Sequence, residues 1–189
     1  RPMSDGATWW WVRHGPTHEK TFVGWRDVPA DLSDTAALAR LSAYLPDAAV
    51  VIASTLIRQS ATADALQGPR QRLPDTPDLR EFSFGDWDGE SFDAVAKTHP
   101  TLSRAYWDAP GDTRPPGGES WNQAAARAAP IVDQMNAEHA GGHIIAVAHI
   151  GIIMTQIGRA TGLAPDQVIN HRIDNLSVTR ITYGMNGDA

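Results

Sequence analysis

The chain has 189 residues, a net charge of −6 and no cysteine. This length predicts one domain over residues 1–189, in which residues 1–7 are expected to be an N-terminal tail outside the fold. The acidic balance argues against a nucleic-acid partner, and the lack of an apolar run of about 18 residues argues against a membrane span. Without cysteine there is no disulfide framework, so we expect a cytoplasmic location.

Segments with strand and helix patterns alternate along the chain. Strand composition marks five segments, of which the third is the least regular: 8–12, 48–53, 79–84, 143–148 and 176–183. Helical spacing marks five others: 33–45, 55–66, 120–140, 152–161 and 165–169. This alternation predicts an α/β fold, a three-layer α/β/α domain with a mainly parallel central sheet.

Capping and turn residues support these boundaries. Ser33 is the expected N-cap of the first helix, and Ser120 with Gln123 has the spacing of a capping box. Two stretches rich in proline and glycine, 67–77 and 109–118, are expected to be loops.

Charged side chains follow three of the predicted strands directly. Arg13 and His14 end the first strand, Arg58 begins the helix after the second, and His149 ends the fourth. Because ligands of parallel α/β sheets bind at the carboxyl ends of the strands, these side chains should meet at one edge. Glu81, in the segment 79–84, is expected nearby.

This set of side chains fits phosphoryl transfer. Two arginines can each bind a tetrahedral dianion through a pair of N–H donors, and a neutral imidazole can attack phosphorus. A second imidazole, if protonated, can stabilise the charge that develops in the transition state. A carboxylic acid can protonate the leaving oxygen and then act as a base toward water.

Five segments, in the order VRHGPT, ASTLIRQSATA, EFSFGDWDG, PPGGES and VAHIG, carry a resemblance that covers about residues 8–183. In them the chain resembles the histidine phosphatase superfamily, which includes cofactor-dependent phosphoglycerate mutases and alpha-ribazole phosphatases. The resemblance implies a phosphoglycerate mutase-like fold and activity without a metal or other cofactor. It further implies that His14 is the nucleophile, Arg13 and Arg58 phosphate ligands, His149 a catalytic and phosphate-binding residue, and Glu81 the proton donor.

The chain departs from the family pattern at two places. Pro16 follows the Arg-His-Gly motif, and the loop after it lacks the family's common asparagine, whose space His18 or Lys20 could fill. Ile150 stands where relatives usually have glycine. Because these changes affect substrate selection more than phosphate chemistry, the candidate substrate-binding residues are Thr17, Trp25, Arg26 and Ile150.

The same residues also have structural interpretations. Arg13 alone could form a salt bridge, and Glu81 alone could be a surface carboxylate. His14 and His18 have a spacing that binds zinc on a helix, but here they follow a strand and a Gly-Pro pair. Glu119 could complement a helix dipole or contact a substrate. The joint occurrence of the motif residues favours the catalytic interpretation.

We therefore predict a hydrolase that acts on a small phosphorylated metabolite through a phosphohistidine. Mutase chemistry is the alternative, but the segment between Glu81 and Gly117 is short and holds only three cations: Lys97, Arg104 and Arg114. A catalytically silent protein that binds phosphorylated ligands is the alternative from another class. Alpha-ribazole phosphate, sugar phosphates, phosphoglycerate and phosphoserine all stay open as substrates, as does the oligomeric state.

Overall fold

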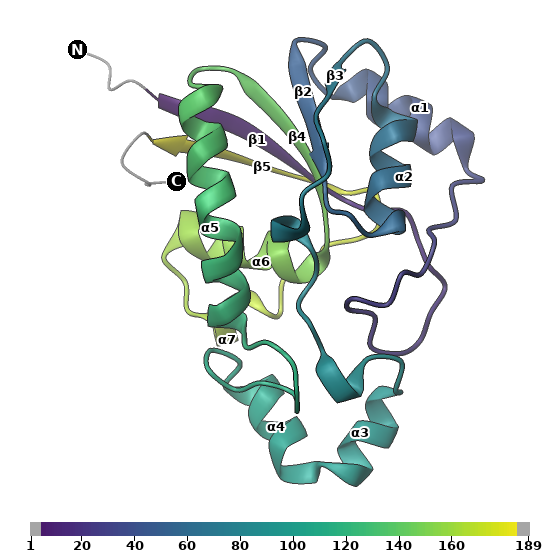
Figure 1. Cartoon of the computed structure of the whole chain (residues 1–189), viewed down its shortest axis with the longest axis vertical. Helices are drawn as coiled ribbons and strands as arrows, with labels where there is room; N and C mark the ends of the chain where they lie inside the picture. Colours follow the sequence, from purple (N-terminus) through teal and green to yellow (C-terminus); the bar gives the residue numbers. More distant parts are fainter. Residues whose placement is uncertain (1–4, 185–189) are drawn as a thin grey trace.

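A computed structural model describes residues 5–184, in which five strands form one sheet (Figure 1). The strands are β1 (Asp5–Arg13), β2 (Ala49–Ala53), β3 (Gln71–Arg72), β4 (His143–Ala148) and β5 (Val178–Gly184). Their order is β3-β2-β4-β1-β5, and every pair is parallel except β1 with β5. The carboxyl ends of β1, β2 and β4 therefore lie at one edge, as predicted.

Helices cover both faces of this sheet and give three layers (Figure 1). They are α1 (Thr35–Tyr44), α2 (Ile57–Leu66), α3 (Phe92–Thr98), α4 (Pro100–Asp108), α5 (Trp121–Glu138), α6 (Ile150–Thr161) and α7 (Pro165–Val168), with short 3-10 turns at Pro77–Leu79 and Gly85–Trp87. Apolar residues of α1 and α2 pack on one face, and those of α5 and α6 pack on the other. The predicted α/β fold class is confirmed.

The tryptophans of β1 show how one strand serves both layers. Trp9 and Trp11 point to the α5–α6 side, where their rings stack at 4.7 Å. Their indole N–H groups are satisfied, since Trp9 donates to Asn136 and Trp11 to the Tyr183 hydroxyl. Trp10, on the opposite side of the strand, packs against the cluster under α1 and α2. The alternation fixes the register that carries Arg13 and His14 to the sheet edge.

Helices α3 and α4 lie beyond this edge, at the lower end of Figure 1. Their inner side is held by a separate apolar cluster of Phe22, Trp87, Val95 and Tyr106. The sequence patterns predicted neither helix. Together they form a cap that faces the carboxyl ends of the strands.

Several predicted boundaries were wrong. The segment 79–84 is not a strand, because its backbone groups bond to side chains: Trp25 donates to the Glu81 carbonyl and Ser83 N–H donates to Glu119. Asp34, not Ser33, caps α1. The predicted loop 67–77 contains β3, whereas 109–118 is a loop and the capping box of α5 is present.

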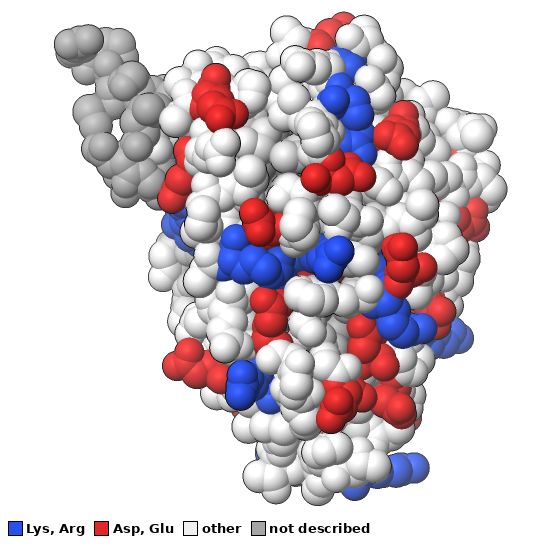
Figure 2. Space-filling view, viewed as in Figure 1, with Lys and Arg blue, Asp and Glu red and all other residues white. Residues whose placement is uncertain are grey.

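The predicted tail 1–7 was also partly wrong, because β1 begins at Asp5; residues 1–4 lie outside the described part of the chain. No helix in residues 5–184 is both long and apolar enough to cross a bilayer. Cationic and anionic side chains are interspersed on the face shown in Figure 2, with no extended patch of one sign.

Candidate active site

Two histidines face each other at the carboxyl edge of the sheet. Arg13 pairs with Ala148 across β1 and β4, so the next residues along the two strands, His14 and His149, are neighbours. Their ring centroids are 5.3 Å apart, and both side chains are buried. The strand register alone therefore produces the histidine pair that the sequence predicted.

The His14 ring is held in one orientation by its own loop. Nδ1 lies 2.7 Å from the carbonyl oxygen of Gly15, to which it donates, so Nε2 is left with a free lone pair. Asn175 donates to the His14 carbonyl at 3.0 Å and fixes the backbone from the other side. Burial lowers the pKa of His14 to about 3, with Arg58 and Arg13 acting in the same direction. A neutral imidazole with an exposed Nε2 lone pair is a competent nucleophile.

Arg13 and Arg58 bring two guanidinium groups to the same place. Arg58, 1% exposed at the start of α2, donates to the carbonyls of Gly24 and Arg26. Arg13 donates to the Ile173 carbonyl at 2.6 Å, while its buried Nε has no partner among residues 5–184. Each guanidinium therefore uses only some of its five N–H donors in hydrogen bonds to the protein. The remaining donors can bind an oxyanion.

His149 lies fully buried at the N-terminus of α6. Its Nδ1 contacts the Gln59 side-chain amide, and its Nε2 lies 3.3 Å from the Ser54 hydroxyl. Burial lowers the pKa of His149, and the charge of Arg58 lowers it further. The imidazole is therefore neutral in the unliganded protein, and a bound phosphate dianion would favour its protonated form.

Glu81 places a buried carboxyl group in the same cavity. Its two oxygens accept hydrogen bonds from the N–H groups of Phe82 (2.9 Å) and Gly151 (3.2 Å). Burial raises the pKa of Glu81, against the opposing effect of these bonds and of Arg58 and Arg13. A carboxyl group with a raised pKa can keep its proton and donate it.

Arg13, His14, Arg58 and Glu81 open into one cavity of about 360 Å³, whereas the fully buried His149, a predicted phosphate ligand, is not part of its wall. Its wall is formed by Arg13, His14, Thr17, Glu19, Thr21, Phe22, Val23, Arg58, Glu81, Phe82, Phe84, Phe92, Trp107, Trp121, Ile150, Gly151, Met154 and Ile169. Of the predicted substrate-binding residues, Thr17 and Ile150 line it.

The sequence matches the model of the histidine phosphatase superfamily (branch 1) over residues 9–189. The chain belongs to this superfamily. A 2,3-bisphosphoglycerate-dependent phosphoglycerate mutase from Nitrobacter winogradskyi is 26% identical, over 94% of this chain and 91% of the relative. The solved structure of YhfR from Bacillus stearothermophilus is 25% identical and superposes with a TM-score of 0.84, covering 97% of this chain and 98% of that one.

A mycobacterial glucosyl-3-phosphoglycerate phosphatase of known structure is 26% identical, with a TM-score of 0.78 over 92% of this chain and 89% of that chain. Relatives of this histidine phosphatase superfamily member thus include both phosphatases and mutases, all at low identity. The fold and the family are shared, whereas the reaction depends on the residues of the site.

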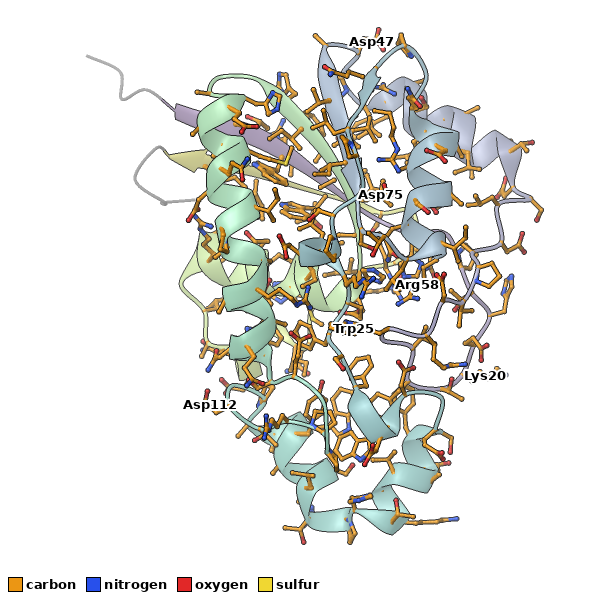
Figure 3. All side chains as sticks on the ribbon, in the orientation of Figure 1. Lys20, Trp25, Asp47, Arg58, Asp75 and Asp112 are labelled. Carbon is orange, nitrogen blue, oxygen red and sulfur yellow. The ribbon has the colours of Figure 1, made fainter. Side chains whose placement is uncertain are left out.

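Trp25 and Arg26, two of the residues that the sequence named as candidates for substrate binding, are not among those that line the cavity. The Trp25 indole donates to the Glu81 carbonyl at 2.7 Å, and its ring is half-exposed beneath Arg80. Arg26 pairs with Asp88 at 3.0 Å, and its carbonyl accepts from Arg58. Both residues therefore hold candidate site residues in place, Trp25 through the backbone of Glu81 and Arg26 through the side chain of Arg58. Figure 3 shows Trp25 and Arg58 near the centre of the view.

The residues expected to replace the family asparagine lie elsewhere. His18 is exposed and pairs with Asp31 at 2.8 Å, and Lys20 lies at the edge of the molecule in Figure 3. Glu119 does not contact the cavity, but accepts from Ser83 N–H and pairs with Arg127 at 2.9 Å. Within residues 5–184 no three potential metal ligands converge.

Sequence reasoning missed the residues that hold the site and most of its apolar wall. Gln59 and Ser54 hold His149, Asn175 holds the His14 backbone, and Arg127 donates to the Glu81 carbonyl. Gln59 lies within a matched motif next to Arg58, which is a signal that could have found it. The cap residues Phe92 and Trp107 lie in two short helices of 7 and 9 residues.

Proposed function

We propose that this histidine phosphatase superfamily member hydrolyses small phosphomonoesters through a phosphohistidine at His14. The observation that carries the proposal is the pairing of a neutral His14, whose Nε2 is free, with a Glu81 carboxyl whose pKa is raised, both in one cavity with two guanidinium groups. A nucleophile without its proton and an acid with its proton are the two states that the first step needs.

In the first step, Nε2 of His14 attacks phosphorus and the P–N bond forms as the P–O bond to the alcohol breaks. Arg13 and Arg58 bind the equatorial oxygens, and His149, whose ring centroid lies 5.3 Å from that of His14, supports the nucleophile from the buried side of the site. Glu81 transfers its proton to the leaving alcohol oxygen and becomes a carboxylate. The products of this step are the free alcohol and the phosphoenzyme.

In the second step, the Glu81 carboxylate takes a proton from water, whose oxygen attacks phosphorus. The P–N bond breaks, inorganic phosphate leaves and the imidazole regains its lone pair. Glu81 is again protonated, so the cycle closes with no net change in the protein. The same two side chains thus serve both halves of the reaction.

Hydrolysis is favoured over mutase chemistry by the charge of the cavity. Arg13 and Arg58 are its only cations among the described residues, and Lys97 and Arg104 of the cap are exposed and outside its wall. A mutase must hold a second anionic group of its bisphosphate while shielding the phosphoenzyme from water. This cavity offers that group no counter-charge.

Rapid quench with a ³²P-labelled phosphomonoester tests the proposal. We expect an acid-labile, base-stable phosphoenzyme in the parent protein and none in His14→Ala, while the control His171→Ala, at an exposed loop histidine, keeps it. Label on another residue type would overturn the mechanism. Ligand binding with neither label nor turnover on any ester would identify the silent binder instead.

A further inference from the structure

We propose that the cavity selects phosphomonoesters whose alcohol is aromatic or otherwise flat and apolar, with no second anionic group. The reaction itself rests on the proposed function, but the selectivity is a property of binding and can be tested without turnover. Part of the cavity wall has no role in either catalytic step.

Four aromatic rings form this part of the wall: Phe22, Phe84, Phe92 and Trp107, here called the aromatic wall. Phe22 is the centre of the group, with ring centroids 5.1 Å from Phe84, 4.6 Å from Phe92 and 6.1 Å from Trp107. The Phe22 and Trp107 rings are within 21° of parallel. They come from the loop after β1, the segment before Gly85, and both cap helices.

Two members of the aromatic wall are too exposed for a role in the core alone. Phe92 is 49% and Trp107 is 44% exposed, although both line the cavity and contact the buried Phe22. Leaving large apolar rings in water forgoes the free energy of burying them. A flat apolar group entering the cavity would cover these faces and stack against them.

The aromatic wall shares one cavity with the phosphate-binding end, which determines what can occupy it. An occupant bonded to the phosphate would extend from His14 and the arginines along the rings of the cap. The cavity, at about 360 Å³, is at the small end of the range typical for small-molecule sites, roughly 300–1,000 Å³. One phosphate with one ring system suits such a volume better than a large conjugate does.

The charges of the cavity exclude a second anion on the substrate. Arg13 and Arg58 are committed to the phosphate, and the other ionisable groups of the wall, apart from His14, are Glu19 and Glu81. A carboxylate or second phosphate on the alcohol would meet Glu19 and the apolar rings, and it would lose its hydration without gaining a counter-charge. Phosphoglycerate-like substrates are therefore disfavoured.

Three primary alkyl phosphates with leaving groups of similar basicity test this selectivity: 3-phenylpropyl, n-propyl and 3-carboxypropyl phosphate. We expect kcat/KM to be at least tenfold higher for the phenylpropyl ester than for the propyl ester, because the ring is buried against the aromatic wall. The carboxypropyl ester should be the poorest of the three. Equal values for all three, or a preference for the carboxylate, would overturn the inference.

Variants of the aromatic wall test whether it causes the preference for the phenylpropyl ester. Trp107→Ala and Phe92→Ala should each reduce the ratio of phenylpropyl to propyl kcat/KM about fivefold or more. Tyr44→Ala removes an aromatic ring that is 66% exposed on α1, outside the cavity, and should leave the ratio unchanged. Circular dichroism checks folding, and Trp107→Gln replaces Trp107→Ala if the latter unfolds. A ratio unchanged in both cap variants would show that the aromatic wall is not the determinant.

Binding separates this inference from the proposed function. The dissociation constants of 3-phenylpropylphosphonate and n-propylphosphonate, which cannot be hydrolysed, are measured by calorimetry. Tighter binding of the phenyl compound by at least tenfold, with no hydrolysis of any ester, would support the selectivity and reject the phosphatase. Hydrolysis of all esters with equal phosphonate affinities would support the phosphatase and reject the selectivity.

Discussion

His14 and Glu81 occupy one buried site, and burial acts on them in opposite senses. Desolvation disfavours the charged form of each, so it lowers the pKa of the imidazole and raises that of the carboxyl group. Burial therefore favours the uncharged form of both groups. Two titratable groups shifted in opposite directions are the pattern expected of a base or nucleophile next to an acid.

Glu81→Gln tests the proton donor. An alkyl phosphate leaves as a poor alkoxide and needs a proton, whereas the para-nitrophenyl ester leaves as a stabilised phenoxide and hardly does. We expect kcat for an alkyl phosphate to fall about 100-fold or more, in the range of general acid catalysis, and kcat for the nitrophenyl ester to fall much less. Equal losses on both esters would make Glu81 a structural or binding residue.

At the scale of single residues, sequence was a good guide wherever a side chain directly follows a strand. His14 and His149 are neighbours because each follows a paired residue, Arg13 or Ala148, at the ends of the parallel strands β1 and β4. Trp25 and Arg26 show the limit of this reasoning. Both residues are close to the motifs in sequence. The direction in which a loop side chain points, however, depends on partners that are distant in sequence, here the Glu81 carbonyl and Asp88.

Helix α6 links the second histidine to the acid. His149 is its N-cap residue, and the N–H of Gly151 in its first turn donates to Glu81. A side chain at Gly151 has no room, since a Cβ would overlap the Glu81 carboxylate and lie 3.0 Å from the Phe82 ring. Ile150, at a position where relatives usually have glycine, fits because it lies in the helix and does not need a positive φ.

Gly151→Ala should therefore displace the Glu81 carboxyl group while keeping every catalytic side chain. We expect kcat for an alkyl phosphate to fall at least tenfold, with a smaller loss on the nitrophenyl ester, because the group that moves is the proposed proton donor. Gly158→Ala in the same helix is the matched control, since its Cβ would make only ordinary contacts of 3.6 and 3.7 Å. Equal activity in the two variants would show that Glu81 relaxes without losing its function.

The longer helices that flank the sheet were predicted, and the short helices of the cap were not. The helices that flank the sheet have apolar stripes or a capping box, as in α5. The cap helices α3 and α4 have only 7 and 9 residues, and they are held through Phe22, which lies about 70 residues before them in the sequence. Segment 79–84 has strand composition, but its backbone is bound by Trp25, Glu119 and Arg127.

For the whole molecule, a site built from buried ionisable groups makes stability depend on pH. His14 has a folded pKa of about 3 and an unfolded pKa near 6.5, so between these values the unfolded chain binds the extra proton. Its contribution to stability is thus present above the unfolded pKa and lost as the pH falls. His149 acts in the same sense, and Glu81 in the opposite one because its pKa is raised.

Because these contributions partly cancel, a comparison of variants isolates the histidine. The free energy of unfolding, from urea titrations at pH 7.5 and 5.5, should fall less in His14→Asn than in the parent, by about 1.4 kcal/mol for one buried imidazole one unit below its unfolded pKa. His171→Asn, at an exposed histidine, should behave as the parent. If His14→Asn showed the parent's pH dependence, His14 would accept a proton in the folded protein at pH 5.5. The imidazole would then be cationic under mildly acidic conditions and unable to attack phosphorus there.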